Sequence, residues 1–392
     1  MGTFRDVSKS EPCPICGKTD WCTIMKPSQE LYPGQELYIC RRVQQSTITA
    51  NGVEYRFIKE LSDGSSLYGI KTNIPIKKNL DTYIRIHSSK EQNTNYPNLK
   101  DNELLDKIYR SFLNLLTLSS NHTQKLLKDG WTHELIIHSS IRSLHLKKSF
   151  DSYKKCYTDS FERIRLTKVL YEKYGDLDGV PGFYQDDNNN WTFVGRNGML
   201  IPLYDLQGRI YRLRLRLDKP DLDENGKERN KYKNFSSYHC EENEKGILTN
   251  IYSHGSRAGS CIGLYYHPST DMPTVCYVTE GEKKAILANY VLKYPVISLP
   301  GTGTYKKLHE KQEETSAISF LKSIGCKEVV VAYDADKIYN QQVKRYEEKL
   351  IELLLEEQFS VYVADWNIGF GKGLDDILAI GILPNLTPVE NR

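Results

Sequence analysis

Short apolar runs alternate with amphipathic segments in the last third of the chain. The runs at 275–279, 296–299, 328–333 and 360–364 are rich in Val and Ile, as in buried strands. Between them, 283–292 and 343–357 carry apolar residues at helical spacing. Strands that alternate with helices predict a mostly parallel sheet with helices on both faces. We therefore expect a domain of α/β type over residues 272–392.

A helical pattern also marks the region after residue 100. Apolar residues recur at three- and four-residue intervals from Leu104, and Asp101 or Asn102 is suited to cap the first helix. Asn- and Ser-rich sequence near 88–100 predicts a boundary before it. We expect a helical segment over residues 101–150, with two or three helices that end near Leu146. Its four histidines lack paired ligand spacing, and we expect surface or packed residues rather than metal ligands: His122, His133, His138 and His145.

Between residues 180 and 270 the pattern changes to short β-like runs separated by turns. In 211–217 the leucines fall on one face of a strand and three arginines on the other, because side chains alternate with period two. Arginines spaced at about 7 Å match the pitch of a nucleic-acid backbone or a triphosphate. The alternative is the solvated outer face of an antiparallel sheet. The absence of an acidic residue on this face favours phosphate binding by Arg212, Arg214 and Arg216.

Residues 46–100 are polar and carry short alternating runs such as 53–58. They are expected to form either a linker or a small β extension.

At 392 residues the chain is long enough for two to four domains. The net charge is only +3, so any nucleic-acid contact requires local basic patches. No signal peptide and no membrane-length apolar run is evident, which predicts a soluble, cytoplasmic protein. The odd number of cysteines, nine, argues against a disulfide framework.

Four of those cysteines lie before residue 41. Cys13 and Cys16 are separated by two residues and are followed by Gly17. Two thiolates at this spacing make half of a tetrahedral zinc site. Cys22 and Cys40 can supply the other half, although their spacing is irregular and Cys22 is the weaker candidate. The segment 1–45 has too little apolar content to fold unaided, so we expect a structural zinc ribbon. Four neighbouring residues could contact single-stranded DNA through charge or stacking. Each of them taken alone is equally well explained as an ordinary exposed residue: Lys18, Trp21, Arg41 and Arg42.

Acidic residues follow three of the predicted strands in the last domain. Glu280 ends the first, Asp334 and Asp336 follow the strand at 328–333, and Asp375 and Asp376 come after the last. The carboxyl ends of parallel strands meet at one edge of a sheet, which is where α/β proteins place their sites. Carboxylates gathered there suit Mg²⁺ or Mn²⁺ with substrate phosphate. Taken singly, Asp334 or Asp375 is as well explained as a helix cap.

These motifs together resemble the TOPRIM fold of bacterial DnaG-type primases and topoisomerases. The Glu-Gly motif is Glu280-Gly281, the DxD motif is Asp334 with Asp336, and the late acidic motif includes Asp375 and Asp376. The resemblance extends to a basic subdomain over 151–271 and to the cysteines in front, over roughly residues 10–45 and 104–381. It is strongest for primase-like proteins of phages, plasmids and mobile elements. The upstream pieces are Arg196-Asn197 before Pro202, Gly208-Arg209, Arg216, Lys231-Tyr232-Lys233-Asn234 and Gly263-Leu264-Tyr265.

The sequence departs from that family at two positions. Lys284 and Gly373 stand where DnaG-type primases have an Asp. Both changes remove a carboxylate and leave the number of bound metal ions open.

The resemblance implies an α+β multidomain nucleotidyltransferase that makes primers on single-stranded DNA from nucleoside triphosphates. Asp334 and Asp336 would bind Mg²⁺ or Mn²⁺, Asp375 or Asp376 would complete the site, and Glu280 would act as a ligand or base. A separate helicase or polymerase in a bacterial cytoplasm is the implied partner. Phosphates of the triphosphate and template would be held by Arg196, Arg212, Arg214, Arg216, Lys231, Lys283, Lys284 and Lys372.

Two other readings stay open. A non-catalytic loading factor can combine a zinc site with a TOPRIM domain, and the two lost carboxylates favour it mildly. A TOPRIM nuclease is the second. No GxxxxGK[ST] motif occurs in the chain, so P-loop ATPase or helicase activity is not expected.

Overall fold

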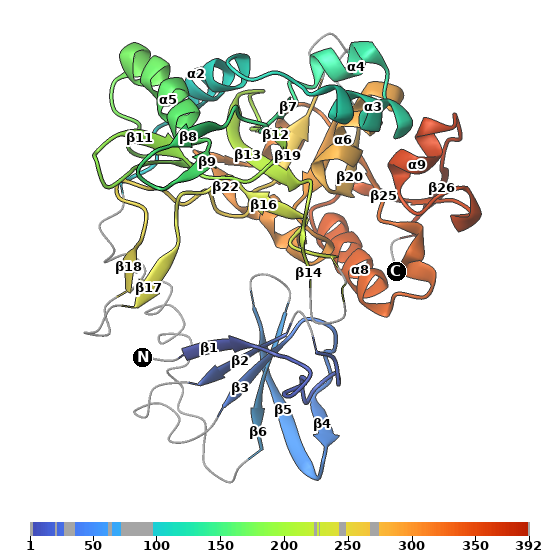
Figure 1. Ribbon diagram of the computed structural model, residues 1–392. Coiled ribbons are helices and arrows are strands. Elements are labelled where there is room, and N and C mark those ends of the chain that lie inside the picture. The colour runs from blue at the N-terminus through green and yellow to red at the C-terminus, as the bar shows by residue number, and fades with distance from the viewer. Residues whose placement is uncertain are drawn as a thin grey trace. The chain divides into compact units, whose positions relative to one another are not determined.

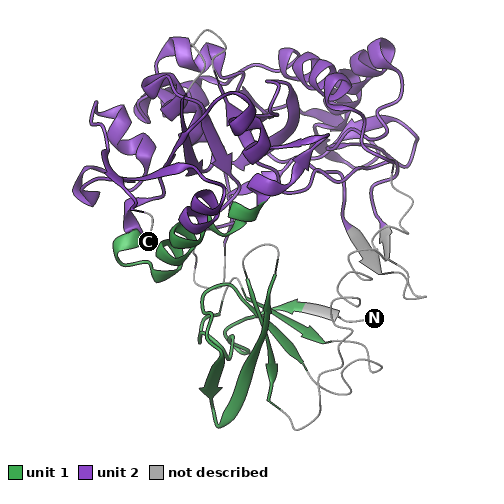
Figure 2. Ribbon diagram, turned by 180° about the vertical axis from the view of Figure 1, so that it is seen from behind, with its two compact units in different colours: residues 1–93, 302–306, 337–349 green, residues 94–301, 307–336, 350–392 purple. Residues whose placement is uncertain are grey.

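The structure is a computed structural model of the whole chain. It describes residues 3–19, 22–26, 36–61, 65–71, 97–222, 226, 228–242, 248–266 and 274–390. Trp21 and most of the predicted boundary near 88–100 lie outside these residues. The chain divides into two compact units (Figure 2). Unit 1 comprises residues 1–93, 302–306 and 337–349, and unit 2 comprises residues 94–301, 307–336 and 350–392.

Unit 1 contains one six-stranded antiparallel sheet. Its strands are β1 (Thr3–Asp6), β2 (Thr23–Lys26), β3 (Leu37–Cys40), β4 (Thr47–Ala50), β5 (Val53–Glu60) and β6 (Ser66–Ile70), in the order β1-β2-β3-β6-β5-β4. Residues 47–70 therefore form the predicted β extension rather than a linker, and they share a sheet with the cysteine-bearing strands. A division at residue 45 would fall inside this sheet.

Unit 2 begins with the predicted helices. They are α2 (Asn102–Asn114), α3 (Ser120–Lys128) and α4 (His133–His138), so three helices form. The side chain of Asp101 accepts a hydrogen bond from the backbone N–H of Leu104 and caps α2, which confirms the first of the two predicted caps. A fourth helix, α5 (Ser160–Tyr174), lies beside α2 (Figure 1).

The middle of unit 2 is built on an antiparallel sheet in the order β16-β13-β12-β7. Its central strands β12 (Gly198–Tyr204) and β13 (Ile210–Leu217) pair along their length, flanked by β7 (Arg142–Ser143) and β16 (Tyr232–Asn234). Two-stranded pairs surround it: β8 (Ser149–Asp151) with β9 (Cys156–Thr158), β10 (Phe183–Gln185) with β11 (Trp191–Phe193), β14 (Asp221–Leu222) with β15 (Glu228–Arg229), and β17 (Cys240–Glu242) with β18 (Leu248–Asn250).

Helices α2 and α5 and this antiparallel sheet share one hydrophobic core. Phe112 of α2 is fully buried and meets Phe183, Phe193 and Phe235 at ring-centroid distances of 5.1, 4.9 and 5.7 Å. Leu166 of α5 belongs to the same buried cluster. The segments predicted as 101–150 and 151–271 therefore pack as one body.

The last part of unit 2 is a six-stranded sheet in the order β19-β21-β20-β24-β25-β26. The four strands β21, β20, β24 and β25 are parallel, and the two edge strands are antiparallel, which confirms the mostly parallel sheet. The strands are β19 (Gly263–Tyr265), β20 (Val275–Glu280), β21 (Val296–Leu299), β24 (Glu328–Val331), β25 (Ser360–Asp365) and β26 (Asn385–Pro388).

Helices and short turns connect these strands. Helix α6 (Glu282–Leu292) packs on β20 and β21 and against α9 (Leu374–Ala379) (Figure 1). Val329, Val330 and Val331 of β24 are all almost fully buried, so both faces of that strand are covered. The remaining elements are η2 (Thr302–His309), β22 (Lys311–Gln312), β23 (Thr315–Ser316), α7 (Ala317–Ser323), η3 (Ala335–Ile338), α8 (Gln341–Glu356) and η4 (Ile368–Phe370).

The fold is thus of mixed α+β class. Among the described residues, no helix combines the length and apolar character required to cross a membrane.

Candidate active site

Three acidic side chains gather at the carboxyl edge of the parallel sheet. Glu280 is the last residue of β20, and Asp334 and Asp336 follow the neighbouring parallel strand β24. The Thr279 hydroxyl donates to the carbonyl of Ala332 at 2.8 Å and holds the two strand ends together. The three carboxylates therefore lie at one edge of the sheet, as the positions of the acidic residues after the strands predict.

Two lysines lie among these carboxylates. The Lys284 ammonium donates to Asp334 Oδ1, and its Nζ is 3.8 Å from Glu280 Oε1. Lys372 Nζ lies 2.9 Å from Asp336 Oδ2 and 3.4 Å from Asp334 Oδ2. Burial lowers the pKa of Lys284, but the carboxylates of Glu280 and Asp334 outweigh it and the net pKa is raised. Both lysines therefore act as fixed cations within the cluster.

The position of Lys284 follows from the turn before α6. Gly281 adopts a φ of 83°, in the region that favours glycine, and α6 begins at the next residue. Residues 280 and 284 are four apart, and side chains at that spacing share one face of a helix. Lys284 thus directs its ammonium group at the Glu280 and Asp334 carboxylates.

One carboxylate oxygen of the cluster remains unsatisfied. Asp336 is 7% exposed, and its Oδ1 is buried and without a hydrogen-bond partner among the described residues. A buried, unpaired carboxylate oxygen is costly unless a cation or donor reaches it. Burial also raises the pKa of Glu280, and the neighbouring Asp334 adds to that rise. This oxygen-rich donor set fits a hard divalent cation such as Mg²⁺ or Mn²⁺.

Asp375 and Asp376, the late acidic pair, have different roles. Asp376 Oδ2 accepts the backbone N–H of Gly373 at 2.8 Å and caps α9, so capping falls on Asp376 rather than on Asp375. Burial raises the pKa of Asp375, and the Asp375 carboxylate in turn helps to raise the pKa of Lys284. Asp375 is therefore the member of the pair that interacts with the charged cluster.

The backbone links this loop to the DxD segment. The N–H of Ala335, between the two aspartates, donates to the carbonyl of Lys372 at 2.9 Å. This bond sets Lys372 beside Asp334 and Asp336 and fixes how the two motifs meet.

A second group of charges comes from four different segments. Burial lowers the pKa of Lys125 on α3, and the positive charges of Arg216, Lys283 and Lys231 lower it further. Arg216, Lys231 and Lys283 are predicted phosphate ligands. Lys125 was not among the residues predicted from the sequence. Lys283 is partly neutralised by Asp129, whose Oδ2 lies 2.6 Å from its Nζ. Lys125 therefore lies within electrostatic reach of three other cations.

Arg212 and Arg214 do not form the open ladder that the alternating pattern predicts. Arg212 is 9% exposed and donates to the carbonyls of Ala258 and Tyr211. Arg214 is ion-paired with Glu282 at 3.2 Å and donates to the carbonyl of Pro300. The arginine face of β13 is covered rather than solvated, because other segments of unit 2 pack over it. Glu282 is the acidic partner that the strand alone could not show.

Arg196 and Lys231 lie at the surface near the end of the antiparallel sheet. Arg196 is paired with Asp221 at 2.7 Å, and Lys231 with Glu228 at 3.5 Å. Because both pairs are exposed, they can exchange partners with a bound phosphate at little cost.

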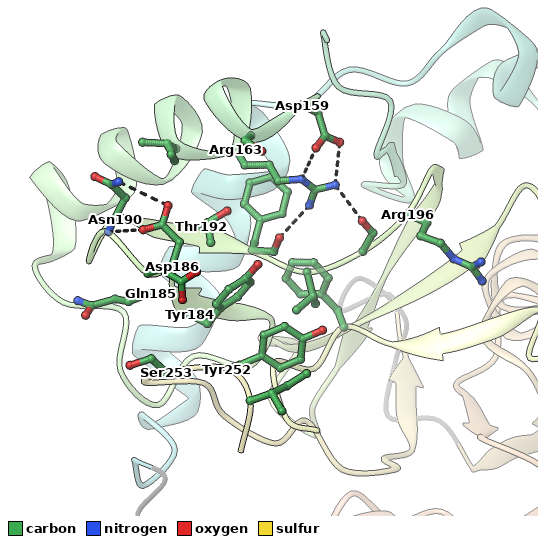
Figure 3. A pocket seen from close by; sticks show the side chains of 18 of the residues that line it. Asp159, Arg163, Tyr184, Gln185, Asp186, Asn190, Thr192, Arg196, Tyr252 and Ser253 are labelled. Atoms are coloured by element: carbon green, nitrogen blue, oxygen red, sulfur yellow. Dashed lines mark hydrogen bonds and ion pairs between the residues drawn. The ribbon is translucent and has the colours of Figure 1, made fainter. Parts of the chain in front are cut away.

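A cavity of 1320 Å³ lies in unit 2, and none of the acidic cluster residues line it (Figure 3). The rings of Tyr184 and Tyr252 line it, with centroids 4.7 Å apart. Arg163 on its wall is held by both oxygens of Asp159 and donates to the carbonyls of Phe193 and Gly195. These guanidinium contacts make the wall rigid, and Arg196 stands at its margin.

In unit 1 the four predicted cysteines come together. The Sγ atoms of Cys13, Cys16, Cys22 and Cys40 all lie within 4.8 Å of one another, and three of the side chains are buried. Gly17 has a φ of 68°, and its N–H donates to the carbonyl of Cys13, which forms the expected turn under the site. Four thiolates in this arrangement fit tetrahedral zinc, and the weaker candidate Cys22 belongs to the cluster.

Comparisons with known proteins give these results. Residues 268–381 match a family described as a domain of unknown function, DUF3854. No curated protein matches the chain.

Several solved structures resemble the chain. A DnaG primase catalytic domain bound to single-stranded DNA is 15% identical with a TM-score of 0.40, covering 70% of this chain and 76% of that one. A DNA primase domain from Pseudomonas aeruginosa is 14% identical with a TM-score of 0.42, covering 72% and 79%. The zinc-binding and RNA polymerase domains of the Aquifex aeolicus primase are 13% identical with a TM-score of 0.44, covering 88% and 77%.

Proposed function

We propose that this protein is a primase-like nucleotidyltransferase of TOPRIM type. It joins nucleotides on a single-stranded DNA template during replication of a phage, plasmid or mobile element. The observation that carries the proposal is the buried, unpartnered Oδ1 of Asp336 beside Asp334 and Glu280 at the carboxyl edge of a parallel sheet, within the described part of the chain. This is a donor set for a hard divalent cation placed where α/β proteins bind their substrates.

In this reaction the 3′-hydroxyl oxygen of one nucleotide attacks the α-phosphorus of a triphosphate. A new P–O bond forms, the bond to the bridging oxygen breaks, and pyrophosphate leaves. Glu280, Asp334 and Asp336 would hold Mg²⁺ or Mn²⁺, which when bound neutralises charge on the reacting phosphate. Glu280 is alternatively the base that accepts the hydroxyl proton.

The lysines of the cluster would contribute charge of their own. Lys284 and Lys372 present ammonium groups to the same space, and such groups stabilise the negative charge that develops on phosphate oxygens. Lys284 replaces a carboxylate, so fewer anionic ligands are available and one cation site is more consistent with this charge than two.

The cationic group formed by Lys125, Arg216, Lys231 and Lys283 would hold the triphosphate tail or the template backbone. Its members come from four segments of unit 2 and influence one another's charge. Arg196 would add a surface contact to the template. Arg212 and Arg214 would instead maintain the fold, because their guanidinium groups already have partners within it.

The Cys13, Cys16, Cys22 and Cys40 cluster would hold a structural zinc ion, and the sheet around it would contact the single-stranded template. A separate replicative helicase or polymerase would extend or deliver these primers.

A second candidate is a non-catalytic factor that binds single-stranded DNA. The Lys284–Asp334 and Lys372–Asp336 pairs favour it, because built-in cations reduce the need for a bound metal ion. The acidic cluster would then be a stabilised scaffold, and only the basic groups would contact DNA.

The test is primer synthesis on a mixed single-stranded template with labelled nucleoside triphosphates and Mg²⁺ or Mn²⁺. The wild type is compared with Asp336→Asn and Glu280→Gln, and with Glu352→Gln as an exposed carboxylate control on α8. Short products that disappear in the first two variants and persist in the third support the enzyme. DNA binding without products in any protein would establish the binding factor. Nicking of plasmid DNA without added nucleotides would identify a nuclease instead.

A further inference from the structure

Two histidines and one aspartate meet in unit 2 outside the acidic cluster. His122 Nε2 lies 2.7 Å from Asp218 Oδ1, and His145 Nε2 lies 2.5 Å from Asp218 Oδ2. The two imidazole rings are 4.7 Å apart, and one ligand atom from each of the three side chains lies within 4.8 Å of the others. The three groups come from α3, from the segment after β7, and from the residue that follows β13.

The second ring nitrogen of His122 is also held. His122 Nδ1 lies 2.6 Å from Ser143 Oγ. Ser143 Oγ accepts the backbone N–H of Ser119 at 2.8 Å and donates its own hydrogen to Ser119 Oγ at 3.2 Å. Ser143 Oγ can therefore accept a hydrogen bond from a protonated Nδ1. In that tautomer the Nε2 lone pair of a neutral His122 faces the Asp218 carboxylate and is available to a metal ion.

The Asp218 carboxylate therefore faces both imidazoles, with one oxygen 2.7 Å from His122 and the other 2.5 Å from His145. His122 is 5% exposed at its side chain. A metal ion at this point would take its ligands from three side chains that already face one another.

We propose that His122, His145 and Asp218 bind a zinc ion. Two imidazole nitrogens and one carboxylate oxygen form a donor set that suits zinc, with a fourth position for water. Ligands at about 2.0 Å from a tetrahedral zinc lie roughly 3.3 Å apart, so the present spacings of 2.7 and 2.5 Å need to open by roughly 0.6 to 0.8 Å. The side chains of His145 and Asp218 are 31% and 28% exposed, which gives solvent access to that fourth position.

The surroundings of the site match those of bound metals. A metal-bound histidine usually donates its other ring N–H to an oxygen that fixes the ring orientation, and Ser143 Oγ supplies this for His122. Ser143 is itself fixed by β7, whose pairing with β12 joins it to the antiparallel sheet. His122 on α3 and Ser143 on β7 are therefore held by regular structure.

A metal here would join three separate segments next to the cationic group. His122 lies one helical turn from Lys125 on α3, and Asp218 lies two residues after Arg216 of β13. Zinc binding would therefore fix the spacing of two of the cations assigned to phosphate. The site itself depends only on its own three ligands and holds whether or not the protein synthesises primers.

Zinc stoichiometry of the full chain tests the proposal. The metal-free protein is reloaded with Zn²⁺, excess ion is removed by dialysis, and bound zinc is measured by mass spectrometry. We expect two zinc ions per chain in the wild type, one in the four-cysteine cluster and one in this site. His145→Ala and Asp218→Asn should bind one, while His138→Ala, an exposed histidine on α4, should bind two.

Cobalt substitution separates the two sites by spectroscopy. Cobalt bound by thiolates gives intense charge-transfer absorption in the near ultraviolet, whereas a nitrogen and oxygen site gives only weaker visible bands. His145→Ala should lose only the visible contribution of the second ion and keep the thiolate bands. Ser143→Ala should weaken zinc binding at this site by about 10- to 100-fold. One zinc per chain in the wild type, or two retained in His145→Ala, would overturn the assignment, as would loss of zinc in His138→Ala.

Discussion

The Lys284 ammonium group donates a hydrogen bond to Oδ1 of Asp334. A cation that belongs to the chain therefore contacts a carboxylate that would also bind the proposed metal ion. We expect this ammonium group to limit how strongly the cluster attracts a divalent ion.

Removing that charge should strengthen metal binding. Lys284→Gln frees Asp334 Oδ1 and removes a repelling charge, so we expect Mn²⁺ to bind at least about tenfold more tightly. Titration of bound Mn²⁺ by electron paramagnetic resonance measures the change. Lys168→Gln, an exposed lysine on α5, is the control and should leave the affinity unchanged. Weaker binding in Lys284→Gln would show that Lys284 supports the metal site and does not compete with it.

The buried pair between Arg214 and Glu282 should be important for stability. Their side chains are 12% and 2% exposed, so Arg214→Met strands a buried carboxylate and should cost about 3 kcal/mol of unfolding free energy. Urea denaturation measures this loss. Arg214→Met combined with Glu282→Leu should recover most of it, because both charges are then removed together. Arg196→Met, whose partner Asp221 is exposed, should have little effect, and equal losses at the two arginines would contradict the burial argument.

The cysteine cluster should control the order of unit 1. Cys40→Ser removes one of four predicted zinc ligands, and structural zinc contributes roughly 10 kcal/mol or more to such folds. Hydrogen exchange should show lost protection in β2 and β3. Cys156→Ser, at an exposed cysteine in β9, should leave protection intact. Unchanged exchange in Cys40→Ser would mean that the sheet folds without metal.

The Asp159–Arg163 pair on the wall of the cavity should make part of the stability acid-sensitive. Burial raises the pKa of Asp159, but hydrogen bonds from Arg163 outweigh it and the net pKa is lowered. A carboxylate with a lowered pKa stabilises the fold above its ordinary pKa, and this stabilisation is lost as the pH falls through the folded value. Asp159→Asn should therefore cost about 2 kcal/mol near neutral pH, with a smaller difference near pH 3. Urea denaturation across this range measures the gap, and a gap independent of pH would contradict the ionic role of Asp159.

The strand-end rule predicted the acidic cluster well because it depends on topology alone. Four parallel strands are enough to place Glu280, Asp334 and Asp336 at one edge. Deciding between Asp375 and Asp376 as the cap needed the actual turn at Gly373, since both fit the sequence pattern. The cysteine cluster was predictable because four thiols have few other uses in a short reduced segment.

Partners contributed by distant segments could not be predicted. The alternation in 211–217 shows that Arg214 and Leu215 point to opposite faces, but it does not show that Glu282 lies against one of them. His122 and Asp218 are 96 positions apart, and no local spacing relates them. The prediction that these histidines are ordinary surface or packed residues was made for the same reason.

The shared core of α2, α5 and β13 limits how the protein can be divided experimentally. A fragment that begins at residue 151 would leave the aromatic cluster around Phe183 and Phe235 without Phe112, and would expose it to water. Such a fragment should aggregate, even though it retains every acidic residue of the parallel sheet. Deletion mapping would then report a loss of activity for residues 101–150 whose origin is insolubility. Point substitutions on the surface are the safer way to assign roles within unit 2.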